Sequence, residues 1–239
     1  MLAIWKREMQ NYFLTPIGYV FTGVFVLVGG FFFFLYNIAI ASADMTAMFG
    51  NLVSLFMLLV PILTMKLLSE ERRNKTDQLL LTSPRSIASI VAGKFFAAAT
   101  VLLVAMAIML AYVGILCAYS QPHAGQLVSN YLGFFLLGCC YISIGVLMSA
   151  LTESQVSAAV LTLGANLLLQ LFESVGSSIT IPYLPFLNDV LSWLSLHARY
   201  SAFAAGIFSV ANVFYDVSFC GIILFLAVRV IDRRRWSEG

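Results

Sequence analysis

The sequence predicts an all-α membrane protein in which six helices cross the bilayer. Of its 239 residues, 61% are hydrophobic and 10% are charged, whereas a soluble domain has about 45–50% apolar and about 25% charged residues. The mean hydropathy is +0.95. A water-soluble enzyme is excluded because so few charges could not cover so much apolar surface. A disordered chain is excluded because disorder requires low hydrophobicity.

Six apolar runs are candidates for the transmembrane helices. A crossing helix needs about 20 mostly apolar residues, and the runs lack the two-residue alternation of membrane β-barrel strands. The predicted spans are 17–41, 51–68, 95–119, 131–151, 156–172 and 214–231. We expect them to form a single transmembrane domain that covers residues 1–239.

The basic residues predict the orientation of these spans. With six crossings, twelve of the thirteen Lys and Arg residues fall on one side of the membrane, and Arg199 alone falls on the other. Loops rich in Lys and Arg stay in the cytoplasm. We therefore expect a multi-pass protein of a bacterial cytoplasmic (plasma) membrane, with both termini in the cytoplasm.

Residues 1–16 predict an amphipathic helix that lies in the membrane interface before the first span. Apolar positions recur at helical spacing, at Leu2, Trp5, Met9, Tyr12 and Phe13. The other face carries polar residues, namely Lys6, Arg7, Glu8, Gln10 and Asn11. Pro16 should end this helix. It is either a plain membrane anchor or an elbow helix that supports the cytoplasmic face of a transporter.

The segment 69–94 is the most informative part of the chain outside the spans. Ser69 is a candidate N-cap, and Glu70 and Glu71 would occupy the first helical turn, where negative charge is favourable. This helix should run to about Thr82, since the residue before Pro84 is disfavoured in a helix. A second short helix, 85–93, would lead into the third span.

Three consecutive leucines, at 79–81, follow the charged part of this segment. Three leucines gain nothing in an exposed loop, whereas a helix that docks into a protein cleft can bury them there. The turn 152–155 between spans four and five faces the same side. It is either a simple helix cap or a second contact, through Thr152, Glu153 and Ser154, with a cytoplasmic partner.

The outer segment 173–213 is too apolar for an exposed loop, yet glycine and proline interrupt it. We expect a re-entrant or interfacial hairpin there, with a further interfacial helix at 198–208. Within the spans, Asn166 and Gln170 share one helix face. They either form an interhelical hydrogen bond or line a path for the transported compound.

Sequence motifs for catalysis and metal binding are absent. Gly93-Lys94 lacks the first glycine and the following Ser/Thr of a phosphate-binding loop, and neither H-E-x-x-H nor G-x-S-x-G occurs. We predict no catalytic residue and no metal site. Glu153, Glu173 and Asp216 lie near span ends, where we expect them to reach water. No carboxylate is therefore expected at mid-membrane, where ion-coupled transport would need one.

Together these features resemble the ABC-2 type transporter permeases over nearly the whole chain, and most closely the short permeases of the gliding-motility type. The matching stretches are 6–21, 59–84, 145–161, 194–208 and 229–236. The stretch 59–84, LVPILTMKLLSEERRNKTDQLLLTSP, is the most specific of them. The resemblance implies a type V exporter-like fold and a non-catalytic subunit of an ATP-binding cassette exporter.

The resemblance also implies the partners. Two permease subunits would pair, and each would contact a cytoplasmic ATPase subunit that binds ATP and Mg²⁺, while this chain binds no cofactor and no nucleic acid. The helix after the second span would be the coupling helix that enters a cleft of the ATPase. Its contact residues would be Glu70, Glu71, Arg72, Arg73, Thr76, Asp77, Leu79, Leu80, Leu81, Thr82 and Pro84.

Three other functions stay open at the level of sequence. They are an ATP-independent secondary transporter or channel, a membrane-embedded enzyme, and a structural membrane subunit. The substrate, the direction of transport, the choice between homodimer and heterodimer, and the presence of an accessory protein on the outer side are also open.

Overall fold

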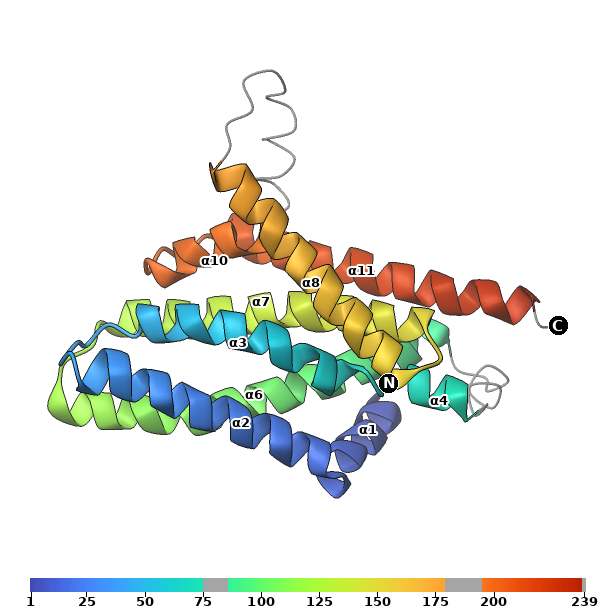
Figure 1. Ribbon diagram of the computed structural model, residues 1–239, viewed down its shortest axis with the longest axis horizontal. Coiled ribbons are helices and arrows are strands. Elements are labelled where there is room, and N and C mark those ends of the chain that lie inside the picture. The colour runs from blue at the N-terminus through green and yellow to red at the C-terminus, as the bar shows by residue number, and fades with distance from the viewer. Residues whose placement is uncertain (75–85, 179–194, 238–239) are drawn as a thin grey trace, which may run out of the picture.

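A computed structural model describes residues 1–74, 86–178 and 195–237, with the backbone alone at 172–178 and 234–237. It is an elongated bundle of helices (Figure 1), and the described part contains no strand. The predicted all-α membrane class is therefore confirmed. The elements are α1 (Leu2–Leu14), α2 (Pro16–Phe33), the π-helix η1 (Phe34–Ile38), α3 (Thr46–Thr64), α4 (Ser69–Arg73), α6 (Ile87–Tyr119), α7 (Ala124–Leu151), α8 (Gln155–Ser178), α10 (Leu196–Ala204) and α11 (Val210–Ser237).

Five helices of the described chain are long and apolar enough to cross a membrane. They cover Pro16–Ile38, Thr46–Arg73, Ile87–Tyr119, Ala124–Leu151 and Val210–Arg233. The fifth predicted span, 156–172, corresponds to the shorter apolar stretch Gln155–Leu171 of α8. We still predict that α8 crosses the membrane as well, which would give six spans in total.

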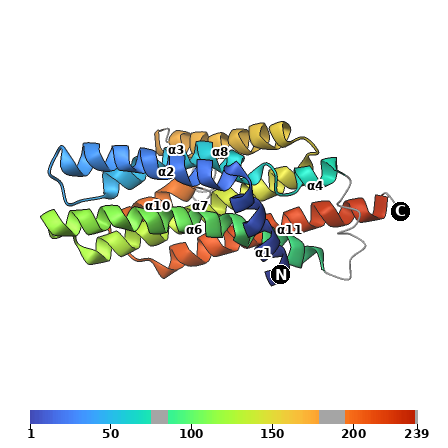
Figure 2. The same cartoon turned by 90° about the horizontal axis from the view of Figure 1, so that it is seen from below.

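The two ends of the bundle differ in composition. Both chain termini lie toward the right in Figures 1 and 2, together with α1, α4 and the turn between α7 and α8, and we call this the terminal end. At the opposite, distal end lie the connections α2–α3 and α6–α7, with α10 toward the same side. Most of the described basic residues lie at the terminal end.

The first helix forms as predicted but presents a different face to the bundle. α1 ends at Leu14, and Pro16 is the first residue of α2, where a proline needs no amide hydrogen. The buried residues of α1 are Ile4, Glu8 and Tyr12, whereas Leu2 is 80% exposed. The assignment of Glu8 to the polar face was therefore wrong, because ion pairs described below compensate its charge inside the protein.

The charged segment after α3 also differs from the prediction. Ser69 is the first helical residue of α4 and not its N-cap, which is Leu68. α4 ends at Arg73, and Asn74 follows it in a turn. The predicted continuation of this helix to Thr82 lies outside the described residues. The predicted contact residues from Thr76 to Pro84 lie outside the described residues.

The separate helix predicted at 85–93 does not exist. α6 begins at Ile87, capped by the Ser86 hydroxyl, which accepts a hydrogen bond from the N–H of Ser89, and continues unbroken for 33 residues. The nearest proline after Gly93 is Pro122, beyond the end of α6, and a single glycine does not end a helix. Gly93 instead allows α1 to approach, since a Cβ there would lie 3.0 Å from Ile4 Cγ2.

The core lies between α2, α3, α6 and α7. Phe25, Phe49, Phe56 and Phe134 are almost fully buried and form a connected aromatic cluster. The glycines of α7 permit close contact with neighbouring helices, as expected for small residues in membrane bundles. At Gly145 a Cβ would lie 2.3 Å from Thr64 Oγ1 of α3.

At the distal end, α8 continues to Ser178, six residues beyond the predicted span, and residues 179–194 of the predicted hairpin lie outside the described residues. The helix predicted at 198–208 is α10, Leu196–Ala204, which starts earlier because the Ser195 hydroxyl caps it. The hydroxyl of Thr46 donates to the carbonyl of Ala204 at 3.2 Å, which joins α10 to α3.

Candidate functional site at the terminal end of the bundle

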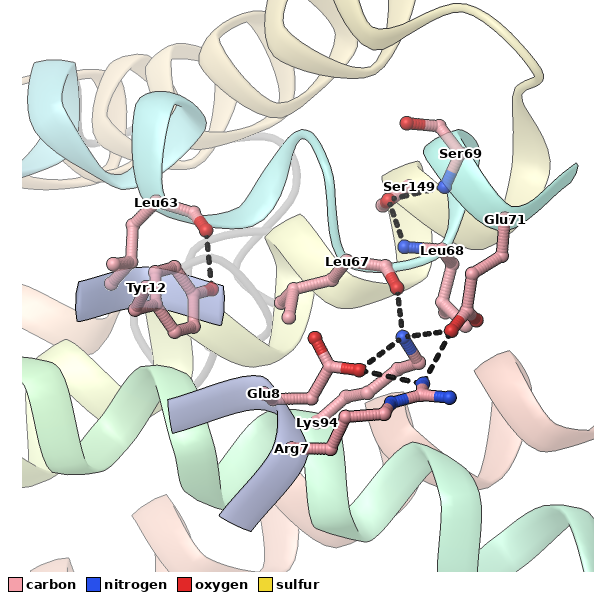
Figure 3. A network of polar contacts seen from close by, with 10 residues as sticks. All are labelled: Arg7, Glu8, Tyr12, Leu63, Leu67, Leu68, Ser69, Glu71, Lys94 and Ser149. Carbon is pink, nitrogen blue, oxygen red and sulfur yellow. Dashed lines mark hydrogen bonds and ion pairs between the residues drawn. The ribbon is translucent and has the colours of Figure 1, made fainter. Parts of the chain in front are cut away.

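A buried lysine organises the terminal end. Lys94 of α6 is 1% exposed, and its Nζ lies 3.1 Å from Glu8 Oε1 of α1 and 3.0 Å from Glu71 Oε1 of α4. It also donates to the carbonyl of Leu67 at the α3–α4 corner (Figure 3). A buried ammonium group is stable only when such partners replace its water.

Arg7 completes this charge network. Its Nη2 lies 2.8 Å from Glu8 Oε1 and 2.6 Å from Glu71 Oε1, so two cations face two carboxylates. Burial alone would raise the pKa of Glu8, but the charge of Lys94 and the hydrogen bonds from Arg7 and Lys94 outweigh it. The pKa therefore lies below its ordinary value. Glu8 is thus ionised at neutral pH, and the network of Arg7, Glu8, Glu71 and Lys94 is neutral overall.

Tyr12 ties α1 to the end of α3. Its buried hydroxyl donates to the carbonyl of Leu63 at 2.6 Å (Figure 3). Burial raises the pKa of Tyr12 well above its ordinary value, so the phenol remains a proton donor. On the same helix, Trp5 Nε1 donates to Thr100 Oγ1 of α6 at 3.0 Å. α1 is therefore held against α3 and α6 by specific polar contacts.

The first turn of α4 is capped by a residue that lies 80 positions later. Ser149 Oγ of α7 accepts hydrogen bonds from the N–H of Leu68 at 3.0 Å and of Ser69 at 3.1 Å. A hydroxyl in this place satisfies helix amides that have no partner within the helix. Ser69 itself, the predicted cap, donates its own hydroxyl to the carbonyl of Met65.

The two segments predicted to contact a partner lie next to each other. Arg72 of α4 forms an ion pair with Glu153 in the α7–α8 turn and donates to the carbonyl of Leu151 at 3.3 Å. Thr152 in the same turn donates to the carbonyl of Met148. Arg73 is exposed on α4. The sequence placed these segments on one side, and the structure brings them into contact.

Glu71, another predicted contact residue, belongs to the charge network. Its carboxylate is bound by Arg7 and Lys94, and its side chain is 18% exposed. Glu70, one residue earlier, is half-buried and lines a cavity of about 570 Å³ beside the charge network. This cavity lies between α1, the start of α2, the α3–α4 corner, α4 and α6.

Among the described side chains of the spans, Asn166, Gln170 and Asp216 are the polar residues that bear on the prediction. Asn166 is fully buried, and its amide has no hydrogen-bond partner in the described part of the chain. Gln170 is half-buried one turn later. Asp216 is 4% exposed, against the expectation that it reaches water, because α11 turns it toward α7, where Cys140 Sγ lies 3.9 Å from its Oδ1.

Comparison with known proteins agrees with this architecture. Residues 2–231 match the family described as ABC-2 family transporter protein. The chain belongs to the ABC-2 family. No curated protein matches this chain. The chain is therefore a membrane-spanning permease of an ABC transporter. Its gliding-motility type and its lack of catalytic activity stay predictions.

Several residues that hold this ABC-2 permease together at the terminal end were not singled out from the sequence. Glu8, Lys94 and Ser149 each act through a partner more than 25 positions away. The positive-inside pattern contained one signal, because Glu8, Glu71 and Lys94 all fall on the same predicted side of the membrane. This signal alone could not have selected Lys94 as the partner, because twelve of the thirteen basic residues fall on that side.

Proposed function

We propose that this permease is an exporter subunit driven by ATP hydrolysis on a separate cytoplasmic ATPase, which docks at the terminal end. The proposal rests on the contacts that attach α4 to the rest of the bundle. This short charged helix is bound to α1 and α6 through Glu71, to α7 through Ser149, and to the α7–α8 turn through Arg72.

These contacts would transmit a movement of the partner to the membrane helices. A force on α4 reaches four other elements through these contacts, so they move together when the partner changes shape. Two-state movements of this kind arise when a packed interface is biased by a ligand. In the proposed transporter the bias comes from ATP and Mg²⁺, both bound by the ATPase.

The remaining parts of the proposal concern assembly and location. Two permease chains pair in a bacterial plasma membrane, and each offers α4 and the turn 152–154 to an ATPase subunit. The terminal end faces the cytoplasm, as the concentration of basic residues there favours. The residues from Thr76 to Pro84, including the three leucines, continue the docking segment.

Co-purification in detergent with the ATPase encoded beside this chain tests the proposal. Arg73→Glu reverses an exposed charge on α4, whereas Lys6→Glu reverses an exposed charge on α1 and serves as the matched control. We expect the wild type and Lys6→Glu to retain the ATPase and Arg73→Glu to retain about tenfold less, with unchanged thermal unfolding. Glu71 is unsuitable for this purpose because its reversal would break the internal network.

Loss of the ATPase from all three proteins, or equal retention by all three, would contradict docking through α4. If no ATPase binds the wild type, the alternative is an ATP-independent secondary transporter, which the buried carboxylate of Asp216 favours. Export is tested separately by comparing the contents of cells with and without the chain. Exported compounds should accumulate inside cells that lack it.

A further inference from the structure

The cavity beside the charge network has the size and position of a ligand site. Its volume of about 570 Å³ falls within the roughly 300–1,000 Å³ of small-molecule pockets. It is lined by the joint between α1 and α2 at Thr15 and Ile17, and by the α3–α4 corner on the opposite side. The joint is where the chain passes from α1 into a helix long enough to cross the membrane.

The charges around this cavity are not all satisfied within the protein. Arg7, Glu8, Glu71 and Lys94 compensate one another, as Figure 3 shows. Two further lining residues, Lys66 and Glu70, are half-buried and make no ion pair in the described part of the chain. The cavity therefore offers one positive and one negative group to a ligand while it is neutral overall.

An apolar surface leads away from the cavity along α2. Ile17 lines the cavity, and the exposed residues that follow it at intervals of three or four are Val20, Val24, Leu27 and Phe31. Residues at this spacing share one face of a helix. The stripe runs over most of the length of a span, so an acyl chain can lie along it while a polar group occupies the cavity.

We propose that this cavity binds the head group of a zwitterionic phospholipid with a primary ammonium group, such as phosphatidylethanolamine. Lys66 binds the phosphate, and Glu70 accepts hydrogen bonds from the ammonium. An anionic head group would meet a single available cation next to the carboxylate of Glu70. A quaternary ammonium carries no N–H to donate to Glu70. The inference does not depend on the proposed ATPase or on the direction of transport.

Native mass spectrometry of delipidated protein tests this inference. Phosphatidylethanolamine, phosphatidylcholine and phosphatidylglycerol are added back separately, and the bound fraction is compared. We expect phosphatidylethanolamine to bind at least about tenfold more tightly than the other two, which corresponds to one charge-assisted hydrogen bond. Equal binding of the three lipids would overturn the proposal.

Two variants test which residue binds the phosphate of the head group and which binds its ammonium. Lys66→Gln should weaken binding of both ethanolamine and choline lipids, whereas Glu70→Gln should abolish the preference for ethanolamine over choline. Lys6→Gln, which changes an exposed residue outside the cavity, should bind as the wild type does. Thermal unfolding of each variant shows whether it is folded. A folded Glu70→Gln protein that keeps the preference would overturn the assignment.

A soluble ligand could present the same phosphate and ammonium groups to the cavity. O-phosphoethanolamine carries the same phosphate and ammonium groups without acyl chains. It should compete with the lipid only weakly, because it cannot use the stripe on α2. Competition at concentrations as low as those of the lipid itself would overturn the lipid assignment in favour of a soluble phosphate ester.

Discussion

A lysine that is 1% exposed in a helix of this membrane protein needs full compensation of its charge. Lys94 receives it from two carboxylates and one backbone carbonyl, which belong to α1, α4 and the corner before α4. Removing one partner from a buried ion pair costs about 3–5 kcal/mol, because the remaining charge is left without compensation. The terminal end is therefore sensitive to this single side chain.

Replacement of Lys94 by methionine should destabilise the protein by about 3–5 kcal/mol. The change leaves Glu8 and Glu71 close to each other with Arg7 as their cation, and Arg7 is 47% exposed and better hydrated. Denaturant-induced unfolding in detergent measures the loss. Lys6→Met, at an exposed position of α1, should change stability by less than about 1 kcal/mol.

A second variant separates charge imbalance from a packing defect. Adding Glu71→Gln to Lys94→Met removes one uncompensated carboxylate and should recover part of the lost stability. If the double variant is less stable than Lys94→Met alone, the network model fails. Equal stability of Lys94→Met and Lys6→Met would contradict it as well.

Single residues also show how far sequence predicts the site. The charged composition of α4 and its position after the second span could be predicted, because both depend on local pattern. The burial of Glu8 and the capping by Ser149 could not, since their partners lie 86 and about 80 positions away and periodicity describes only one helix at a time. Helical spacing placed Glu8 among polar neighbours, and tertiary ion pairs turned it inward.

At the scale of the elements, α3 and α7 are in van der Waals contact near the terminal end. Gly145 of α7 faces Thr64, the last residue of α3, just before the corner that leads to α4. A Cβ at position 145 would lie 2.3 Å from Thr64 Oγ1 and 2.8 Å from its Cγ2. The helices can come this close only while position 145 lacks a side chain.

Gly145→Ala should therefore destabilise the bundle by about 1–3 kcal/mol, the usual cost of overpacking a core. Thermal unfolding in detergent measures the change. Gly114→Ala is the matched control, since a Cβ at position 114 of α6 meets no atom within 4 Å, and it should be neutral or slightly stabilising.

The steric origin of this effect has its own test. Thr64→Ala removes Oγ1 and Cγ2 but keeps Cβ, which would lie 2.7 Å from the new methyl group, so it should restore only part of the stability of Gly145→Ala. A Gly145→Ala protein as stable as Gly114→Ala would show that α3 and α7 can separate without cost, contrary to their close packing.

At the scale of the whole molecule, charge is distributed unevenly along the bundle. Basic residues concentrate at the terminal end, whereas Arg199 lies in α10 toward the distal end. The positive-inside rule then predicts that the terminal end faces the cytoplasm. With this predicted orientation we expect α8 to cross the membrane, because α10 would then lie on the side opposite to α4.

Cysteine labelling with a membrane-impermeant thiol reagent measures this orientation in cells. In a Cys117→Ser background, Gln121→Cys in the α6–α7 connection and Ser201→Cys on α10 should react in intact cells. Asn74→Cys, after α4, should react only after permeabilisation. All three positions are exposed, so accessibility depends on the side of the membrane. Labelling of Gln121→Cys without Ser201→Cys would contradict a crossing by α8.

The fold class followed from composition because the membrane leaves few alternatives to a helix bundle. The break at Pro16 also followed, since proline acts locally. The exact helix ends did not. α6 continues through Gly93, and α4 ends at Arg73, because tertiary contacts and caps decide where a helix begins and ends.

The bond between Ser149 and the start of α4 has a consequence for how such permeases diversify. The hydroxyl contacts main-chain amides at positions 68 and 69, and those amides are present whatever side chains follow. The amino acids exposed on α4 are thus free to change during evolution without loss of this attachment. In the proposed transporter, a new ATPase could then be recruited by altering the exposed surface of α4, while the transmembrane helices are inherited unchanged.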